Sequence, residues 1–228
     1  MNILICCEFF YPSIGGAQKV CEELATNFSK QGHKISIATS LFKKELKRVE
    51  FSNKIEINRF NIKGNKVRGY EGETKLYQNF LLKKKYDAIL IYAAQQWTFD
   101  LVFPIIDKIK SNLFLAPCGF SKLNNFFYKK YFKELPKTLK KFKLNILHSN
   151  NYIDSKFFKK NNIRNKIVIP NGSDFYIKNN KSKNYNLNKK LINILNISNI
   201  RFAKGQDLAI IIYFFSNIKK KSQLILYG

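Results

Sequence analysis

The sequence predicts an α/β fold, in which an open, doubly wound and mostly parallel sheet precedes the start of a second α/β domain. Three observations support this prediction. Short apolar runs recur along the 228 residues, as in strands buried on both faces of a parallel sheet. Segments with apolar residues at helical spacing alternate with these runs. A polar stretch rich in Asn, Lys and Tyr separates the last such unit from the rest.

The first βαβ unit is the clearest. Residues 2–7 (NILICC) predict a buried strand, and a loop containing Pro and Gly follows it. Apolar residues at helical spacing predict a helix over 17–31, which Gly32 ends with a left-handed residue. Residues 34–39 (KISIAT) predict the next strand, so the connection between the two strands is a right-handed crossover.

The alternation continues to residue 172. Further strands are expected at 55–62, 88–92, 112–116, 144–148 and 166–169. Helices are expected at 73–84, 100–109 and 154–160 and over the Lys-rich stretch 124–143. Residues 63–72 are polar and predict a loop.

These patterns predict two domains. Residues 1–172 form a Rossmann-like N-terminal domain that ends in a hinge at Asn171 and Gly172, and 173–190 form a linker. Residues 191–228 contain only one βαβ unit, with a strand at 191–197, a helix at 206–218 and a strand at 223–227. About 40 residues bury too little apolar surface to fold alone. We therefore expect this incomplete domain either to dock on the first domain or to lack its remainder.

The charge is strongly basic. Lys and Arg number 41 against 15 Asp and Glu, which gives a net charge of +26 and favours phosphate-bearing partners such as nucleic acid or an anionic membrane. Arg stands only at positions 48, 59, 68, 164 and 201. Because nucleic-acid readout relies on the planar Arg side chain, no specific nucleic-acid binding is expected. Either codon bias or a functional basic face would explain the abundant Lys, and the two interpretations stay open.

Several classes of protein are disfavoured. The cysteines Cys6, Cys7, Cys21 and Cys118 lack metal-ligand or redox spacing, so no metal site is expected and the thiols are interpreted as buried apolar groups in a reducing cytoplasm. Residues 1–12 lack a basic start and include Glu8, unlike a signal peptide. The longest apolar run, 208–215, falls short of the about 20 residues of a membrane span. The expected location is the cytoplasm, with peripheral contact at the inner face of the membrane.

Three motifs stand in a characteristic order. The segment S-I-G-G-A (13–17) lies between a predicted strand and helix, where backbone N–H groups favour an anion, although Gly15-Gly16 alone also fits a tight turn. V-I-P-N-G (168–172) and K-G-Q-D-L-A (204–209) follow. With the opening N-I-L-I-C-C-E-F-F-Y-P, these motifs resemble the GT-B glycosyltransferases of family four across essentially the whole chain.

The resemblance implies two facing domains, with acceptor recognition mainly in the first and the nucleotide-sugar donor mainly on the second. It implies that Gly15 and Gly16 bring backbone amides to the donor phosphate or the transferred sugar. Lys204 would neutralise the nucleoside-diphosphate leaving group, assisted by Arg201, although many relatives have that Arg at the position of Asn199. No cofactor is implied.

The chain departs from the family pattern in two places. Cys118 and Gly119 occupy a substrate-binding loop that usually carries His-Gly, and a neutral thiol is a poorer base, which favours a packing role for Cys118. The family's E-x-x-x-x-x-x-x-E motif is absent, so no catalytic residue is assigned. His148 ends a predicted strand at the ligand-facing edge of the sheet.

The segment 120–143 interleaves aromatic residues with Lys. This pattern is typical of interfacial helices on anionic lipid, and it also fits a surface helix whose aromatic side chains face the core. The two interpretations stay open.

The sequence thus predicts part of a retaining, metal-free glycosyltransferase that is inactive alone. A nucleotide sugar would be the donor, and a saccharide or lipid-linked acceptor in surface glycan assembly would receive the sugar. Two alternatives belong to other classes: a non-catalytic remnant or partner subunit that binds an acceptor or a complementing C-terminal chain, and a basic nucleic-acid-binding protein.

Overall fold

The computed structural model describes residues 1–172, 188 and 190–228. The chain divides into two compact units, Met1–Gly172 (unit 1) and Ser173–Gly228 (unit 2), which are described separately below. The linker predicted at 173–190 lies outside the described residues except for positions 188 and 190.

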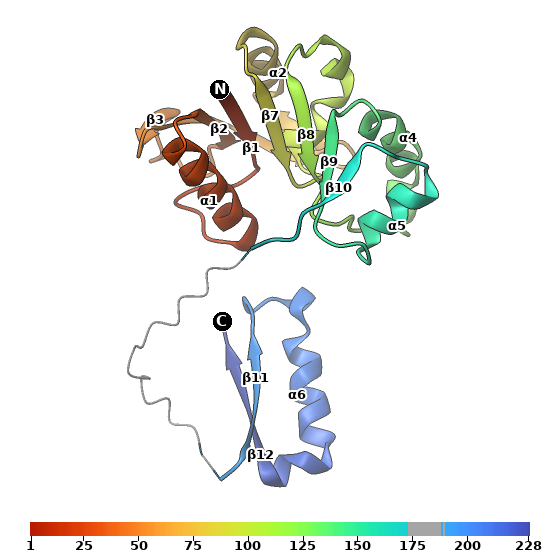
Figure 1. Cartoon of the computed structure of the whole chain (residues 1–228). Helices are drawn as coiled ribbons and strands as arrows, with labels where there is room; N and C mark the ends of the chain where they lie inside the picture. Colours follow the sequence, from red (N-terminus) through yellow and green to blue (C-terminus); the bar gives the residue numbers. More distant parts are fainter. Residues whose placement is uncertain (173–187, 189) are drawn as a thin grey trace. The chain divides into compact units, whose positions relative to one another are not determined.

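Unit 1 is built on an eight-stranded sheet of order β10-β9-β8-β7-β1-β2-β4-β3 (Figure 1). All neighbouring strands in this sheet are parallel except β3 and β4, which confirms the predicted fold class. The strands are β1 (Asn2–Cys6), β2 (Lys34–Ser40), β3 (Val49–Ser52), β4 (Ile55–Phe60), β7 (Ala88–Tyr92), β8 (Asn112–Ala116), β9 (Leu144–Leu147) and β10 (Lys166–Val168).

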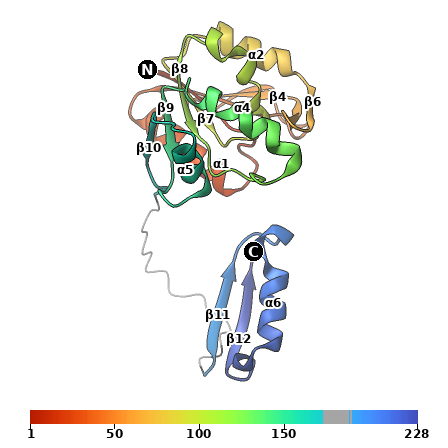
Figure 2. The same cartoon turned by 90° about the vertical axis from the view of Figure 1, so that its right-hand side faces the viewer.

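Helices connect these strands on both faces of the sheet (Figure 2). They are α1 (Gly16–Lys30), α2 (Thr74–Lys83), α3 (Trp97–Asp100), α4 (Lys129–Leu139) and α5 (Ile153–Lys160), with short 3-10 helices η1 (Phe103–Lys108) and η2 (Phe126–Tyr128). Ile3 and Ile5 of β1 pack against α1, whereas Leu4 and Cys6 pack in the cluster that includes α2. Because successive side chains of a strand point to opposite faces, a strand covered on both faces is continuously apolar.

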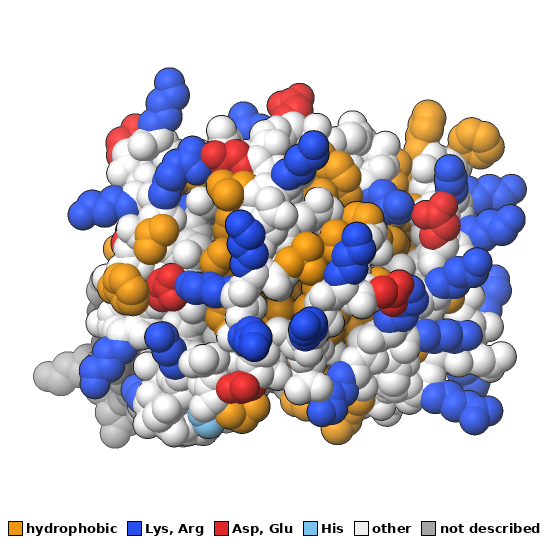
Figure 3. All heavy atoms as spheres, turned by 90° about the horizontal axis from the view of Figure 1, so that it is seen from above, with side chains coloured by type: hydrophobic (Ala, Val, Ile, Leu, Met, Phe, Trp, Pro, Cys, Tyr) orange, Lys and Arg blue, Asp and Glu red, His pale blue; other side chains and the backbone are white. Residues whose placement is uncertain are grey.

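The basic excess lies on the surface. Figure 3 shows one face of the molecule, over which Lys and Arg side chains are spread with few acidic side chains between them. Among the Lys and Arg residues of the described chain, only Arg59 is buried. The described residues contain no helix with the length and apolar character that crossing a bilayer requires.

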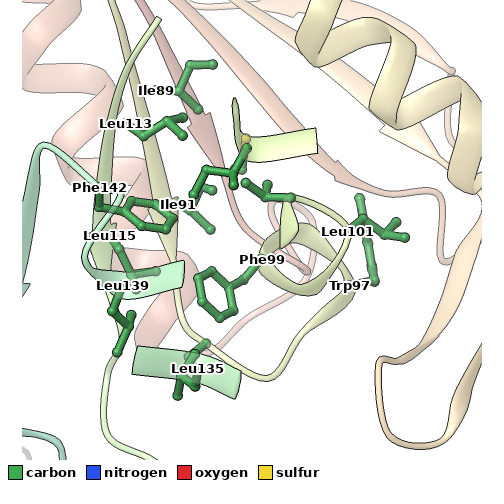
Figure 4. Close-up of a cluster of buried hydrophobic side chains, with 14 of the residues drawn as sticks. Ile89, Ile91, Trp97, Phe99, Leu101, Leu113, Leu115, Leu135, Leu139 and Phe142 are labelled. Atoms are coloured by element: carbon green, nitrogen blue, oxygen red, sulfur yellow. The ribbon is translucent and has the colours of Figure 1, made fainter. Parts of the chain in front are cut away.

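The larger core cluster lies beneath α3 and α4 (Figure 4). Ile91 of β7 and Leu115 of β8 meet Leu135 and Leu139 of α4, and all four are fully buried or nearly so. Trp97 is also fully buried, and its Nε1 donates to Ser40 Oγ at 3.0 Å. This cluster fixes the position of the loop that follows β7, which bears on the site below.

Four predictions for unit 1 need correction. The loop predicted at 63–72 is an antiparallel hairpin of β5 (Ile62–Asn65) and β6 (Gly69–Gly72), in which Gly64 and Gly72 have positive φ and a Cβ would strike the facing backbone. The strand predicted at 55–62 accordingly ends at Phe60. The helix predicted at 100–109 is split into α3 and η1, because Pro104 interrupts helical hydrogen bonding. The helix within 124–143 covers only Lys129–Leu139.

Unit 2 contains the predicted βαβ unit. Its strands β11 (Ile192–Ile197) and β12 (Ser222–Tyr227) are parallel neighbours, and α6 (Gln206–Phe215) connects them, flanked by η3 (Phe202–Lys204) and η4 (Asn217–Lys221). The helix predicted to reach 218 ends at Phe215. Large apolar side chains on the strands and the helix are exposed, namely Ile192, Leu195, Ile197, Leu208, Ile210, Ile211, Ile212, Phe214, Phe215, Leu226 and Tyr227. The described strands and helix of this unit therefore do not cover these side chains themselves.

Candidate functional site

The candidate site lies where the parallel strands of unit 1 end. The carboxyl ends of β1, β7 and β8 are neighbours in the sheet, so the loops that follow them lie side by side. Open α/β sheets bind their ligands at this edge. Here the loops surround two adjoining hollows that share Ala94, Gln95, Gln96 and Ser121.

The first hollow, called the polar hollow below, has a volume of about 370 Å³. It is lined by Glu8, Gly64, Asn65, Arg68, Ala94, Gln95, Gln96, Ser121, Lys122 and Tyr128. The second hollow, of about 420 Å³, lies against residues 93–96 and 117–121 together with Tyr152 and Ile153. Both volumes are in the range of small-molecule sites.

Strained backbone concentrates around these hollows. Ala93, Gln95, Cys118 and Lys122 have φ of 72°, 61°, 59° and 60°, and they are four of the seven non-glycine residues with positive φ in the described chain. Such residues cost of order 1 kcal/mol each and cluster at functional sites. Gln95 joins the loop after β7 to the loop after β8. Its Nε2 donates to the Ser121 carbonyl and its Oε1 accepts from the Ser121 amide, both at 2.8 Å.

One acidic side chain, Glu8, lines the polar hollow, and the buried Asp100 lies near enough to affect it. Glu8 is half-buried, and burial followed by the charge of Asp100 raises the pKa of its carboxyl group. Asp100 is buried, and its carboxylate accepts hydrogen bonds from Tyr131 Oη at 2.7 Å and Lys66 N at 3.0 Å. Burial raises the pKa of Asp100 to about 6. A carboxyl group with a perturbed pKa in a hollow, here that of Glu8, is typical of a functional site.

The polar hollow can therefore bind a ligand rich in hydroxyl groups. Glu8 accepts hydrogen bonds, Arg68 and Lys122 donate them, and the Gln96 amide does both. The Asn65 side chain is already used within its hairpin, because its Oδ1 accepts from Val67 N and Arg68 N. Among the residues that the structure describes, no group of three His, Cys, Asp or Glu side chains is placed to hold a metal ion.

The glycine corner begins α1, at the same edge of the sheet. Gly16 is the first residue of α1, and Gly15 precedes it with an extended backbone. A Cβ added at Gly16 would meet nothing within 4 Å, and one at Gly15 would meet only the flexible end of Gln18. Local packing therefore does not require either glycine, and the first turn of α1 has no acidic residue and no side-chain cap.

Cys118 and Gly119 lie in the loop after β8. Cys118 Sγ is 3.5 Å from His148 Nε2, and His148 Nδ1 is 3.2 Å from the Ile169 carbonyl oxygen. Burial raises the pKa of the Cys118 thiol to about 11, so the thiol is protonated at neutral pH. The Gly119 amide donates to Asp154 Oδ2 at 3.1 Å. The structure thus brings together Cys118 and His148, which the sequence analysis treated separately.

The remaining predicted residues lie at or beyond the unit boundary. Asn171 and Gly172 are exposed and end unit 1. Arg201 and Lys204 belong to unit 2, where both are exposed and the Lys204 amide donates to the Arg201 carbonyl at 2.9 Å. The approach of Lys204 to Gly15 and Gly16 stays a prediction.

Sequence reasoning missed most of the polar hollow. Glu8 served only as an argument against a signal peptide, and Asn65 and Arg68 fell in the segment predicted as a loop. A signal existed for Gln95 and Gln96, because polar residues directly after a buried strand lie at the ligand-binding edge of a parallel sheet.

Comparison with solved structures finds several proteins of similar fold. Sucrose-phosphate synthase from Thermosynechococcus elongatus matches 100% of the chain with a TM-score of 0.70 and 11% identity. The catalytic domain of starch synthase IV from Arabidopsis thaliana, bound to ADP and acarbose, matches 100% with a TM-score of 0.63 and 12% identity. WaaG, a glycosyltransferase involved in lipopolysaccharide biosynthesis, matches 98% with a TM-score of 0.63 and 16% identity.

The matches cover 70%, 68% and 62% of these three proteins, respectively. Together they show that the chain has the fold of the N-terminal portion of GT-B structures. No protein-family model and no curated protein sequence matches the chain.

Proposed function

We propose that this chain, with the fold of the N-terminal portion of GT-B structures, is the acceptor-binding part of a retaining glycosyltransferase that uses a nucleotide sugar. The observation that carries the proposal is the polar hollow at the carboxyl edge of the sheet. A fold alone does not determine a function, whereas a hollow with hydrogen-bonding side chains at the ligand-binding edge supports a binding role.

A saccharide acceptor, free or lipid-linked, suits the lining of the polar hollow. Sugar hydroxyl groups both donate and accept hydrogen bonds, as the Gln96 amide does. The Glu8 carboxyl group supplies oxygen atoms that accept hydrogen bonds from sugar hydroxyl groups. The two hydrogen bonds between Gln95 and Ser121 would hold the loops after β7 and β8 in place before the acceptor binds.

We also propose donor-binding residues for each unit separately. We assign Gly15 and Gly16 to the donor phosphate or the transferred sugar, because neither residue presents a Cβ that would block approach to the amides. Lys204, with Arg201, would offset the charge of the departing nucleoside diphosphate. Cys118 and Gly119 would line the sugar side of the site, with Asn171 and Gly172 as the hinge. No cofactor and no metal enter this proposal.

The saccharide proposal predicts two sensitive residues. Glu8→Gln and Gln96→Ala are each expected to weaken saccharide binding by roughly tenfold, because each removes one hydrogen-bonding group from the polar hollow. A glycan array would select the best-retained saccharide, and isothermal titration would measure its affinity. Glu45→Gln and Gln31→Ala are matched controls on exposed positions outside the hollow. Retention of no saccharide, or unchanged affinity in both hollow variants, would contradict the proposal.

The apolar side chains that unit 2 does not cover by itself favour a second candidate, a non-catalytic acceptor-binding subunit that pairs with a complementing chain. Two strands and one helix provide few of the groups that enclose a nucleotide sugar. We therefore expect the purified 228-residue chain to transfer no sugar from UDP-glucose or ADP-glucose to the selected saccharide. Chromatography of labelled acceptor would measure transfer, and transfer by the chain alone would refute this expectation.

A further inference from the structure

Two phenylalanine side chains stand out from unit 1 at the start of α4. Phe126 and Phe127, both in η2, are 82% and 77% exposed, and their rings meet edge to face with centroids 6.0 Å apart. The next aromatic residues, Tyr128, Tyr131 and Phe132, are buried in the core. The structure thus divides the segment 120–143, because some of its aromatic side chains stabilise the fold and the Phe pair does not.

Lysine side chains continue this surface along α4. Lys129, Lys133 and Lys137 are spaced by four residues, so they share one ridge of the helix, and Lys130 lies beside them. All four are exposed. With Phe126 and Phe127 they line a surface groove of about 790 Å³ and form what is called the Phe-Lys surface below. Glu134 is the one acidic residue in the lining, and it pairs with Lys66 at 3.4 Å.

We infer that the Phe-Lys surface docks the protein on an anionic lipid bilayer. The Phe pair inserts at the boundary between headgroups and acyl chains, where apolar side chains leave water, and the lysines contact lipid phosphates. Positive charge alone does not distinguish this surface, because lysines are spread widely elsewhere (Figure 3). Within unit 1, the combination of an exposed aromatic pair with an almost purely basic ridge does.

The composition of the surface favours lipid over nucleic acid. Residues 122–143 contain eight Lys and no Arg. Single-stranded nucleic acid is bound by aromatic rings that offer open faces for stacking and by Arg, which adds cation–π contacts. Here the rings lie edge to face, and compact ammonium groups surround them.

Docking through the Phe-Lys surface would also determine where the polar hollow lies relative to the bilayer. Tyr128 follows the Phe pair directly, lines the polar hollow, and has Lys122 Nζ 5.3 Å from its ring centroid. Docking would therefore bring the rim of the hollow to the bilayer, where a lipid-linked acceptor is available. This last step rests on the proposed function, whereas docking itself does not. Failure of saccharide binding and failure of vesicle binding are separate results.

Vesicle co-sedimentation tests the apolar part of the surface. The full chain is expected to bind phosphatidylglycerol-containing vesicles and not pure phosphatidylcholine vesicles. Phe126→Ser with Phe127→Ser should weaken the binding by on the order of 100-fold, because two exposed phenyl rings are lost. Phe51→Ser is the matched control, since Phe51 is 74% exposed on β3, and should leave binding unchanged. Far-UV circular dichroism checks that each variant folds.

A second pair of variants tests the charge. Changing Lys129, Lys130, Lys133 and Lys137 to Gln should weaken binding by on the order of 100-fold and reduce its dependence on salt. The control changes Lys43, Lys44, Lys47 and Lys54 to Gln, which removes the same net charge from exposed positions on other segments. Equal losses in both lysine variants, or wild-type binding by the Phe variant, would overturn the inference. So would tight binding of single-stranded DNA that the Phe variant loses while its vesicle binding persists.

Discussion

Replacing Arg59 by Met is expected to lower the free energy of unfolding of unit 1 by about 3 kcal/mol. The Arg59 side chain has no exposed surface, yet it carries a full charge. Its guanidinium donates to the carbonyl oxygens of Lys47 and Tyr11 and to Glu50 Oε1, each at 3.0 Å. The Met side chain fills similar space without these hydrogen bonds, so two carbonyl groups and a carboxylate lose a partner.

Arg59 also connects parts of the chain that bear on the proposed donor site. It lies on β4, whereas Glu50 lies on the edge strand β3 and Tyr11 in the loop that leads to the glycine corner. Loss of the guanidinium should release that loop from the sheet. We therefore expect faster amide hydrogen exchange over residues 9–15 in Arg59→Met, beyond the rate increase of globally exchanging amides.

Urea unfolding followed by tryptophan fluorescence would measure the change. Trp97 is the one tryptophan of the sequence and is fully buried in unit 1, so its signal reports on that unit. Arg48→Met is the control, because Arg48 forms a 2.7 Å ion pair with Glu73 but its side chain is 56% exposed. An exposed pair contributes less than about 1 kcal/mol. Equal losses of unfolding free energy in the two variants would contradict the prediction, because they would show that the buried Arg59 stabilises the fold no more than the exposed Arg48.

The strands that proved easiest to predict are those covered on both faces. In β1 and β7 nearly every residue is apolar, because helices or loops pack on each side of the sheet centre. The edge strand β3 was missed, since its four residues VEFS alternate between exposed and half-buried positions and contribute no apolar run. The β5–β6 hairpin was missed for a different reason. Glycines allow its two backbones to approach, and side-chain periodicity does not record that property.

The candidate site was predictable in location and not in composition. The rule that ligands bind at the carboxyl edge of a parallel sheet applies to any predicted strand order. The pairing of Gln95 with Ser121, and of Cys118 with His148, joins residues 26 and 30 positions apart. Nothing in local sequence spacing indicates such contacts, because they depend on which strands become neighbours. Arg59 illustrates the same point, since its burial follows from three partners on separate segments.

Asp100 should make unit 1 less stable as the pH rises. Burial raises the pKa of its carboxyl group from 3.8 to about 6, and the opposing hydrogen bonds from Lys66 N and Tyr131 Oη do not cancel this effect. Between these two pH values the folded protein retains a proton that the unfolded chain has released. Stability is therefore highest below pH 3.8 for this group and falls through pH 6. The pKa difference corresponds to about 3 kcal/mol.

Asp100→Asn isolates this contribution. The amide oxygen still accepts from Tyr131 Oη or Lys66 N but cannot ionise, so the variant should be more stable than the wild type at pH 7 by about 3 kcal/mol. Near pH 4 the two proteins should be similar. Glu8 also faces Asp100, and its own raised pKa acts in the same direction, so the quantity to measure is the difference between the variant and the wild type across the pH range.

Urea unfolding from pH 4 to pH 7, again followed by Trp97 fluorescence, would give that difference. Asp107→Asn is the control, because Asp107 pairs with Lys141 at an exposed position and should change stability by less than about 1 kcal/mol. A constant difference between Asp100→Asn and the wild type at every pH would mean that Asp100 is ionised in the folded protein throughout. The carboxylate would then be stabilised by Lys66 N and Tyr131 Oη more strongly than burial disfavours it.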